Sequence, residues 1–273
     1  MFTRIAINSL SLSARMKWLA RLKELAQAIA SRARYAHYLT PRRRFMASRA
    51  MIGQNAAIKQ SFPHGRFERR FVLARVASIA VAGYYKTPTH LLRPIASLIR
   101  VEDESDYAIF DPCAGDGEAI VELAKAWWPK EATRKNVKIY ANEMEKTRYE
   151  ALTSRKGHDG LGYRWPETTH GDAFALQWNK AKVSILYKNP PYDLDKEHGR
   201  LEEKFLDRFV DTLRDGGALF FVVPFYALAK SADTIARHFS QVYCVRFPDG
   251  DFEIFKQVVL IGKKHAPLLD PDP

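Results

Sequence analysis

The chain has 273 residues, with 43 Lys and Arg against 31 Asp and Glu and a formal net charge of +12. This length suffices for one large domain with a buried core, and 47% hydrophobic and 27% charged residues exclude a disordered or fibrous protein. Two cysteines, Cys113 and Cys244, exclude a disulfide framework and indicate a reducing compartment, so we expect a cytoplasmic protein. The longest apolar runs, residues 76–85 and 218–229, are too short to span a bilayer, so we expect no membrane association.

The positive charge is concentrated in the amino-terminal part of the chain. Residues 1–80 contain 16 Lys and Arg against two acids, a net charge of +14, whereas residues 81–273 carry a net charge of −2. A basic arm of this kind is typical of proteins that bind phosphate backbones and release counterions. A solvated helical surface, a mis-assigned start codon and an organelle transit peptide are alternative explanations.

Helical patterns come first along the chain. Apolar residues recur every three or four positions over residues 13–38, and Pro41 ends this pattern because it cannot donate an interior hydrogen bond. A second apolar stretch that is compatible with a helix covers residues 67–81. The basic amino-terminal extension is therefore predicted to be largely helical.

Strand and helix patterns alternate after Gly83. Short runs rich in β-branched and aromatic residues predict strands at residues 107–111, 137–142, 183–188 and 218–223. Apolar periodicity predicts helices at residues 118–127, 144–155 and 201–213. Two further strands, 242–247 and 257–262, flank the turn signal Pro248-Asp249-Gly250 and predict a terminal hairpin. This alternation indicates a mostly parallel α/β sheet that binds ligands at the carboxyl ends of its strands.

A glycine loop follows the first of these strands. Gly115 and Gly117 lie just before a predicted helix, where the backbone allows a close ligand and the helix start favours a negative group. The loop lacks the third glycine of a dehydrogenase and the Gly-Lys-Ser/Thr of a phosphate loop. Glu143 ends the next predicted strand, where a carboxylate can accept hydrogen bonds from both hydroxyls of a ribose.

The glycine loop, the acid after the second strand and the segment Gly171-Asp172-Ala173-Phe174 resemble class I S-adenosylmethionine-dependent methyltransferases. The resemblance implies S-adenosylmethionine as cofactor and no metal. It assigns the methionine part of the cofactor to the glycine loop and to the segment that ends Thr87-Pro88. It assigns the ribose to Glu143 and the adenine to Met144 and Asp172. The implied cofactor-binding residues are Tyr85, Thr87, Pro88, Asp111, Pro112, Ala114, Gly115, Gly117, Glu143, Met144, Asp172 and Ala173.

The tetrapeptide Asn189-Pro190-Pro191-Tyr192 is the most specific feature of the chain. The family uses it to methylate planar nitrogens, namely N6 of adenine, N4 of cytosine or the glutamine amide. Such a nitrogen is a poor nucleophile because its lone pair is delocalised. The Asn189 side-chain oxygen and the Pro190 carbonyl can accept its two N–H groups and favour attack on the methyl group. The prolines stiffen the loop, and Tyr192 can stack on the target ring.

Adenine methyltransferases also keep a base-stacking aromatic residue near the last strand, and the resemblance assigns this position to Phe255 or Phe252. We therefore expect a Rossmann-like methyltransferase sheet over residues 81–264, with seven mostly parallel strands and a terminal antiparallel hairpin. A basic helical extension, residues 1–80, precedes it, and a short Pro-rich tail, residues 265–273, follows it. A carboxyl-terminal target-recognition domain, usual in DNA adenine methyltransferases with this motif order, is not expected.

The preferred interpretation is an S-adenosylmethionine-dependent methyltransferase that acts on N6 of adenine in DNA, with the basic arm as its nucleic-acid contact. The same chemistry on RNA adenine or guanine, or on a protein glutamine, is the first alternative. A nucleic-acid-binding protein that keeps the fold without catalysis is the second alternative, and the intact tetrapeptide and Glu143 argue against it.

Overall fold

The computed structural model describes residues 3–6, 84–101, 106–192, 194–195 and 199–265. The helices predicted at 13–38 and 67–81 lie outside these residues. In the described part of the chain, no helix has the length and apolar character that crossing a membrane requires.

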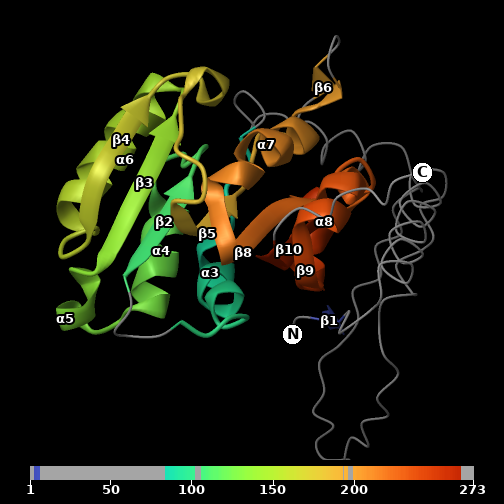
Figure 1. The fold of residues 1–273 in the computed structure, drawn as a ribbon, viewed down its shortest axis with the longest axis horizontal. Helices are drawn as coiled ribbons and strands as arrows, with labels where there is room; N and C mark the ends of the chain where they lie inside the picture. Colours follow the sequence, from blue (N-terminus) through green and yellow to red (C-terminus); the bar gives the residue numbers. More distant parts are fainter. Residues whose placement is uncertain (1–2, 7–83, 102–105, 193, 196–198, 266–273) are drawn as a thin grey trace, which may run out of the picture.

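An eight-stranded sheet with the order β1-β9-β10-β8-β5-β2-β3-β4 forms the centre of the molecule (Figure 1). Its strands are β1 (Thr3–Ala6), β2 (Tyr107–Asp111), β3 (Val137–Glu143), β4 (Arg164–His170), β5 (Val183–Lys188), β8 (Leu213–Pro224), β9 (Phe239–Arg246) and β10 (Gln257–Lys264). Strands β4, β3, β2, β5 and β8 run parallel to one another, and β10 is antiparallel to both β8 and β9. The predicted seven-stranded sheet with its terminal hairpin is confirmed, and β1 adds an antiparallel edge strand beside β9.

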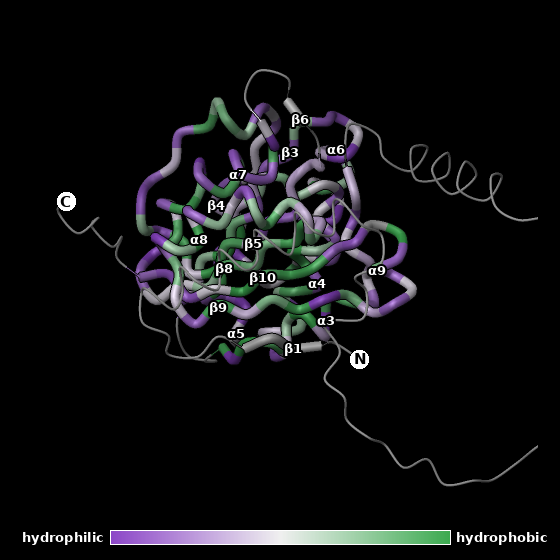
Figure 2. Tube along the Cα trace, turned by 90° about the vertical axis from the view of Figure 1, so that its right-hand side faces the viewer, coloured by the Kyte–Doolittle hydropathy of each residue, from purple (hydrophilic) through white to green (hydrophobic). Residues whose placement is uncertain are grey.

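Helices cover both faces of this sheet. They are α3 (Thr89–Ala96), α4 (Glu118–Trp127), α5 (Glu131–Arg134), α6 (Lys146–His158), α7 (Leu201–Phe209), α8 (Ala232–His238) and α9 (Asp249–Phe255). Leu92 of α3 and Ile120 of α4 join the core on one face, and Phe209 of α7 and Ile235 of α8 join the core on the other. Figure 2 shows the central strands β5, β8 and β10 in the green of apolar residues, with purple hydrophilic segments around them.

Short elements complete the fold. Strands β6 (Leu194–Asp195) and β7 (Gly199–Arg200) form a small separate ladder after the tetrapeptide. One-turn 3₁₀ helices lie at η2 (Ala173–Ala175), η3 (Val210–Thr212) and η4 (Phe225–Ala229). The last of these follows β8, so it lies at the same edge of the sheet as the end of β5.

Several elements differ from the sequence-based expectation. The helix predicted at 201–213 ends at Phe209, and β8 begins at Leu213 rather than at residue 218. Strand β4 was not predicted, because its residues RWPETTH are mostly polar and contain a proline. Both features are tolerated at the sheet edge, where β4 lies and where its register shifts next to Pro166. Helix α9 occupies the place of the predicted hairpin turn. Pro248 precedes its first turn, which contains Asp249 and Asp251, a favourable start for a helix.

Candidate active site

A cavity of about 240 Å³ lies at the carboxyl ends of β2, β3 and β5. Seven of the sequence-predicted residues line it: Pro112, Glu143, Met144, Asp172, Ala173, Asn189 and Pro191. Seven further lining residues were not predicted: Tyr84, Cys113, Asn142, Arg148, Phe174, Leu201 and Phe205. The cavity therefore combines one buried carboxylate, Glu143, with a largely apolar wall and the tetrapeptide.

The Glu143 carboxylate is held by three protein groups. Its Oε2 accepts a hydrogen bond from the Gly115 amide at 2.8 Å, and its Oε1 accepts bonds from the Glu145 amide at 2.9 Å and from Arg148 Nε at 3.0 Å. Only 4% of Glu143 is exposed. These contacts tie the end of β3 to the glycine loop and to the start of α6, so the acid has a fixed orientation toward the cavity.

The glycine loop requires its glycines. Gly115 has φ +60°, and a Cβ atom there would lie 2.3 Å from the Tyr84 hydroxyl oxygen. Gly117 has φ +78°, and its Cβ would lie 2.5 Å from Leu152 Cδ1 of α6. A side chain at either position is therefore excluded by backbone conformation and by a close neighbour. The Arg148 guanidinium carbon lies over the same Tyr84 ring, 4.7 Å from its centroid.

Asp111 does not line the cavity, but it stabilises the turn that leads into the glycine loop. Its carboxylate is 1% exposed and accepts a hydrogen bond from the Cys113 amide at 3.0 Å. Burial raises the pKa of Asp111 to about 7, assisted by the charge of Glu143 and opposed by the hydrogen bond from Cys113. A buried acid that closes a tight turn fixes the path of the loop between β2 and α4.

Lys188 ends β5 directly before the tetrapeptide and is fully buried. Its Nζ lies 5.5 to 5.9 Å from the ring centroids of Phe205, Phe209 and Phe221, and it has no hydrogen-bond partner among the described residues. Burial lowers the pKa of Lys188 to about 7, and nearby groups, Cys113 first, oppose the shift. No sequence pattern predicts a lysine inside this aromatic cluster.

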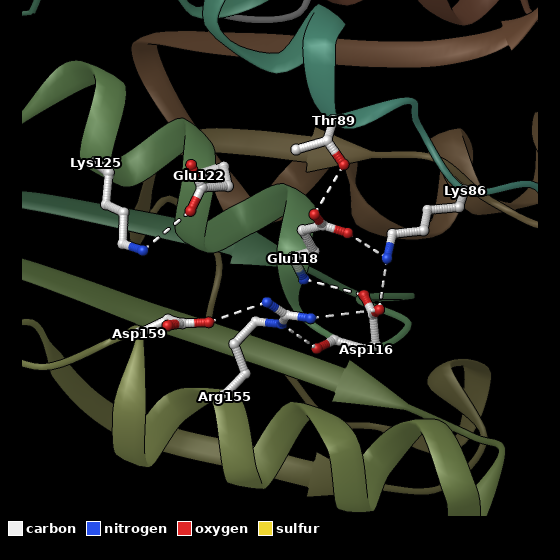
Figure 3. A network of polar contacts seen from close by, with 8 residues as sticks. All are labelled: Lys86, Thr89, Asp116, Glu118, Glu122, Lys125, Arg155 and Asp159. Carbon is white, nitrogen blue, oxygen red and sulfur yellow. Dashed lines mark hydrogen bonds and ion pairs between the residues drawn. The ribbon is translucent and has the colours of Figure 1, made fainter.

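A polar network holds the segment before α3 against the outside of the glycine loop (Figure 3). Lys86 pairs with Asp116 at 2.6 Å and with Glu118, and the Thr89 hydroxyl donates to Glu118 at 2.8 Å. Arg155 of α6 donates to the backbone oxygen of Asp116 at 2.9 Å. Although burial opposes it, the bond from Lys86 holds the pKa of Asp116 below its usual value. The network joins three elements around the loop.

The first residue of the tetrapeptide is fixed by that same segment. The Asn189 Nδ2 donates to the Tyr85 carbonyl oxygen at 2.6 Å and to the Thr87 hydroxyl at 3.0 Å. Both amide hydrogens are therefore used, and Asn189 Oδ1 remains as an acceptor. Pro88 is the N-cap of α3, and the Thr87 hydroxyl shares a 2.6 Å hydrogen bond with Tyr187.

Tyr192 is engaged within the protein. Its hydroxyl donates to Asn189 Oδ1 at 2.6 Å and accepts from Gln257 Nε2 at 2.6 Å. Its ring stacks on Tyr85, with centroids 4.9 Å apart and planes 14° apart. Phe252 is half-buried in α9, with the Arg246 guanidinium 4.0 Å from its ring centroid. The side chain of Phe255 lies outside the described residues.

The predicted residues thus fall into two groups. Several that do not line the cavity support it: Tyr85 and Thr87 hold Asn189, Asp111 holds the loop, and Gly115 contacts Glu143. Among the residues that were not predicted, Arg148 lies in the first turn of α6, five positions after Glu143. A basic residue at this separation from the acid could have been used to predict the ion pair. Asn142 donates to the Pro112 and Gly171 carbonyl oxygens at 3.1 and 3.0 Å, a connection that no sequence pattern reveals.

This sheet, with a glycine loop after β2 and an acid after β3, defines a methyltransferase fold of class I. Residues 60–273 match the uncharacterised methyltransferase family DUF6094, and the chain belongs to this family. It is an S-adenosylmethionine-dependent methyltransferase by family and fold, with S-adenosylmethionine as cofactor. A comparison with curated proteins finds no similar sequence.

Solved structures share the fold at low sequence identity. A protein from Listeria monocytogenes described as a class I S-adenosylmethionine-dependent methyltransferase has a TM-score of 0.55 and 16% identity, over 76% of this chain and 68% of the other. The methyltransferase subunit of a type I restriction-modification system from Streptococcus thermophilus has a TM-score of 0.53 and 16% identity, over 72% and 48%. The type IIG restriction endonuclease BpuSI has a TM-score of 0.52 and 18% identity, over 71% of this chain but 27% of its own.

Proposed function

We propose that the protein transfers a methyl group from S-adenosylmethionine to the exocyclic N6 amine of adenine in DNA. The observation that carries this proposal is the state of Asn189 at the cavity. Its Nδ2 is occupied by Tyr85 and Thr87, so its Oδ1 is held in the orientation of an acceptor, and beside the bond from Tyr192 it keeps a second lone pair. An acceptor in this position suits a substrate that approaches with N–H donors.

The cavity fits the adenosine part of the cofactor. Glu143 supplies the buried carboxylate that two ribose hydroxyls require, and Met144 and Phe174 supply apolar contacts for a ring. The exposed Asp172 caps η2 through the Phe174 amide at 2.9 Å and keeps one carboxylate oxygen for an adenine amino group. The loop of Asp111, Pro112, Ala114, Gly115 and Gly117 would hold the methionine part, beside Tyr85, Thr87 and Pro88. When bound, S-adenosylmethionine supplies an electrophilic methyl group on its sulfonium.

The chain then needs only to orient the amine. Asn189 Oδ1 and the Pro190 carbonyl oxygen accept its two N–H groups, which withdraws the nitrogen lone pair from the ring and directs it toward the methyl group. Pro190 is buried and Pro191 lines the cavity, so this part of the loop is preorganised. The proton released after transfer passes to solvent, and the mechanism requires no strong general base.

DNA is the proposed substrate because of the positive charge of residues 1–80 and the structural similarity to two restriction-system proteins. Residues 1–80 carry a net charge of +14, which suits a phosphate backbone. Two of the structurally similar proteins are a restriction-modification methyltransferase subunit and a restriction endonuclease. If residues 1–80 bind the backbone, removal of residues 1–45, a net change of −9, will flatten the slope of log affinity for DNA against log salt concentration. An unchanged slope would show that residues 1–45 do not bind the DNA backbone.

Methyl transfer from labelled cofactor to separate DNA, RNA and protein pools tests the proposal. We expect label in DNA, and nucleoside mass analysis should identify it as N6-methyladenine. Label in RNA adenine or guanine, or in a protein glutamine, would move the same chemistry to another substrate. Cofactor binding without transfer to any pool would contradict a catalytic role and favour a nucleic-acid-binding protein.

A further inference from the structure

An exposed tyrosine lies in an otherwise buried turn beside the tetrapeptide. Tyr226 belongs to η4, the turn that follows β8, and 42% of it is exposed. Its neighbours Phe225, Ala227 and Leu228 are at most 5% exposed. The turn is thus anchored in the core through its other apolar residues, and one aromatic side chain faces solvent at the carboxyl edge of the sheet, where α/β folds bind ligands.

An arginine is fixed over this ring. The Arg200 guanidinium carbon lies 5.0 Å from the centroid of Tyr226. Arg200 also forms a fork with Glu202, with Nε to Oε2 at 3.2 Å and Nη2 to Oε1 at 2.5 Å. Glu202 is fully buried in the first turn of α7, and a buried carboxylate needs a charged partner. The pair therefore holds the guanidinium in one place and one plane.

Tyr226 and Arg200 belong to segments that adjoin the proposed reaction centre. The hydroxyl of Tyr192 is 3.4 Å from the Val222 carbonyl oxygen of β8, four residues before Tyr226. Partial burial and then the charges of Glu202 and, less strongly, Tyr85 raise the pKa of Tyr226, whereas Arg200 opposes the shift. Arg200 directly precedes Leu201, which lines the cavity together with Asn189 and Pro191.

The aromatic residues expected to stack on the target are already in contact with other groups. Tyr192 stacks on Tyr85, and its hydroxyl bonds Asn189 and Gln257. Phe252 lies under Arg246, with Lys256 Nζ 5.2 Å from its ring centroid. Tyr226 differs from both in its exposure: 42% of it is exposed, whereas Tyr192 and Phe252 are half-buried.

We propose that the Tyr226 ring, held under the Arg200 guanidinium, is the surface on which the target nucleobase stacks before methyl transfer. The proposal rests on the proposed function and names the residues that select its substrate class. Every nucleobase presents a π-face to an aromatic ring, and an arginine beside the ring adds a cation for the base or its phosphate. A glutamine side chain has no such ring, so the pair favours nucleic acid over protein.

Methyl transfer by the full-length chain to unmethylated genomic DNA, with labelled cofactor, tests the proposal. Tyr226→Ala should raise the KM for DNA about tenfold to a hundredfold, as expected for the loss of one stacked base. Tyr226→Phe, which keeps the ring, should retain most of the affinity. Leu161→Ala, which removes a more exposed apolar side chain from the loop after α6, should match the wild type. Cofactor affinity, measured by calorimetry, should be the same in all variants.

Three results would overturn the proposal: a wild-type KM in Tyr226→Ala, an equal loss in Tyr226→Phe, or a parallel loss of cofactor affinity. If the wild type transfers no methyl group to DNA, the proposed function fails, and a binding measurement decides this proposal separately. Wild type and Tyr226→Ala are titrated into an oligonucleotide that contains 2-aminopurine, and fluorescence reports stacking. Weaker binding by Tyr226→Ala supports the stacking surface, and equal binding overturns it.

Discussion

The side-chain amide of Asn189 donates a 2.6 Å hydrogen bond to the backbone carbonyl oxygen of Tyr85, 104 positions earlier in the chain. The segment before α3 thereby orients the tetrapeptide, and the same segment contacts the glycine loop through Tyr84 and Lys86. The proposed cofactor and substrate sites therefore share one structural support.

Glu143→Ala should weaken S-adenosylmethionine binding by about 1–3 kcal/mol, because it removes charged hydrogen-bond acceptors. Calorimetry measures this loss. The cofactor affinity of Glu143→Gln should lie between those of Glu143→Ala and the wild type, because glutamine keeps one acceptor oxygen. Both variants remove the negative charge that pairs with Arg148, so a thermal melt must show that they remain folded. Unchanged cofactor affinity in a folded Glu143→Ala protein would remove the ribose role.

Gly115→Ala should destabilise the fold and reduce cofactor affinity at least tenfold. An alanine there needs a left-handed backbone, which costs about 1–2 kcal/mol, and its Cβ would displace the Tyr84 ring. Gly157→Ala is the matched control: this glycine lies inside α6 with open space around it, so alanine should stabilise the protein by about 0.5–1 kcal/mol. Equal effects at both positions would show that the loop tolerates a side chain.

Lys86→Met should reduce cofactor affinity a few-fold, because Lys86 ties the segment before α3 to Asp116 and Glu118. The effect is small because the pair is partly exposed and such pairs contribute about 0–1 kcal/mol. Lys146→Met removes a looser pair on α6, with 3.9 Å to Glu150, and should leave affinity unchanged. If calorimetry finds no difference between the two variants, the polar network of Figure 3 does not support the site.

Lys188→Met should stabilise the protein, most clearly at neutral pH. The pKa of Lys188 is lowered from 10.5 to about 7 in the folded state, so its contribution to stability is present above 10.5 and is lost as the pH falls toward 7. Methionine has no such dependence. In urea titrations the variant's advantage should therefore grow between pH 10 and pH 7, by at most about 1.4 kcal/mol per pH unit. A pH-independent difference would contradict the burial of a titrating amine.

Sequence reasoning located the elements whose signals are local. Strands Tyr107–Asp111 and Val183–Lys188 and helix Glu118–Trp127 have the predicted bounds because their apolar patterns are strong and buried. Strand β4 was missed because its residues are mostly polar. Polar residues are compatible with a strand at the sheet edge, and the position of β4 at that edge is defined only by the assembled sheet. In the site, the predicted residues Glu143 and Asn189 both line the cavity. The stacking of Tyr192 on Tyr85 depends on a contact between distant segments that no spacing in the sequence encodes.

The central claim is that Asn189 acts on the reacting amine, and a paired measurement on wild type and Asn189→Ala tests it most directly. S-adenosylmethionine affinity is measured by calorimetry, and N6-methyladenine formed in DNA is measured by nucleoside mass analysis in a single turnover. The account predicts a cofactor affinity close to that of the wild type and no detectable N6-methyladenine from a folded Asn189→Ala protein. Methylation by Asn189→Ala at a rate near that of the wild type would contradict it.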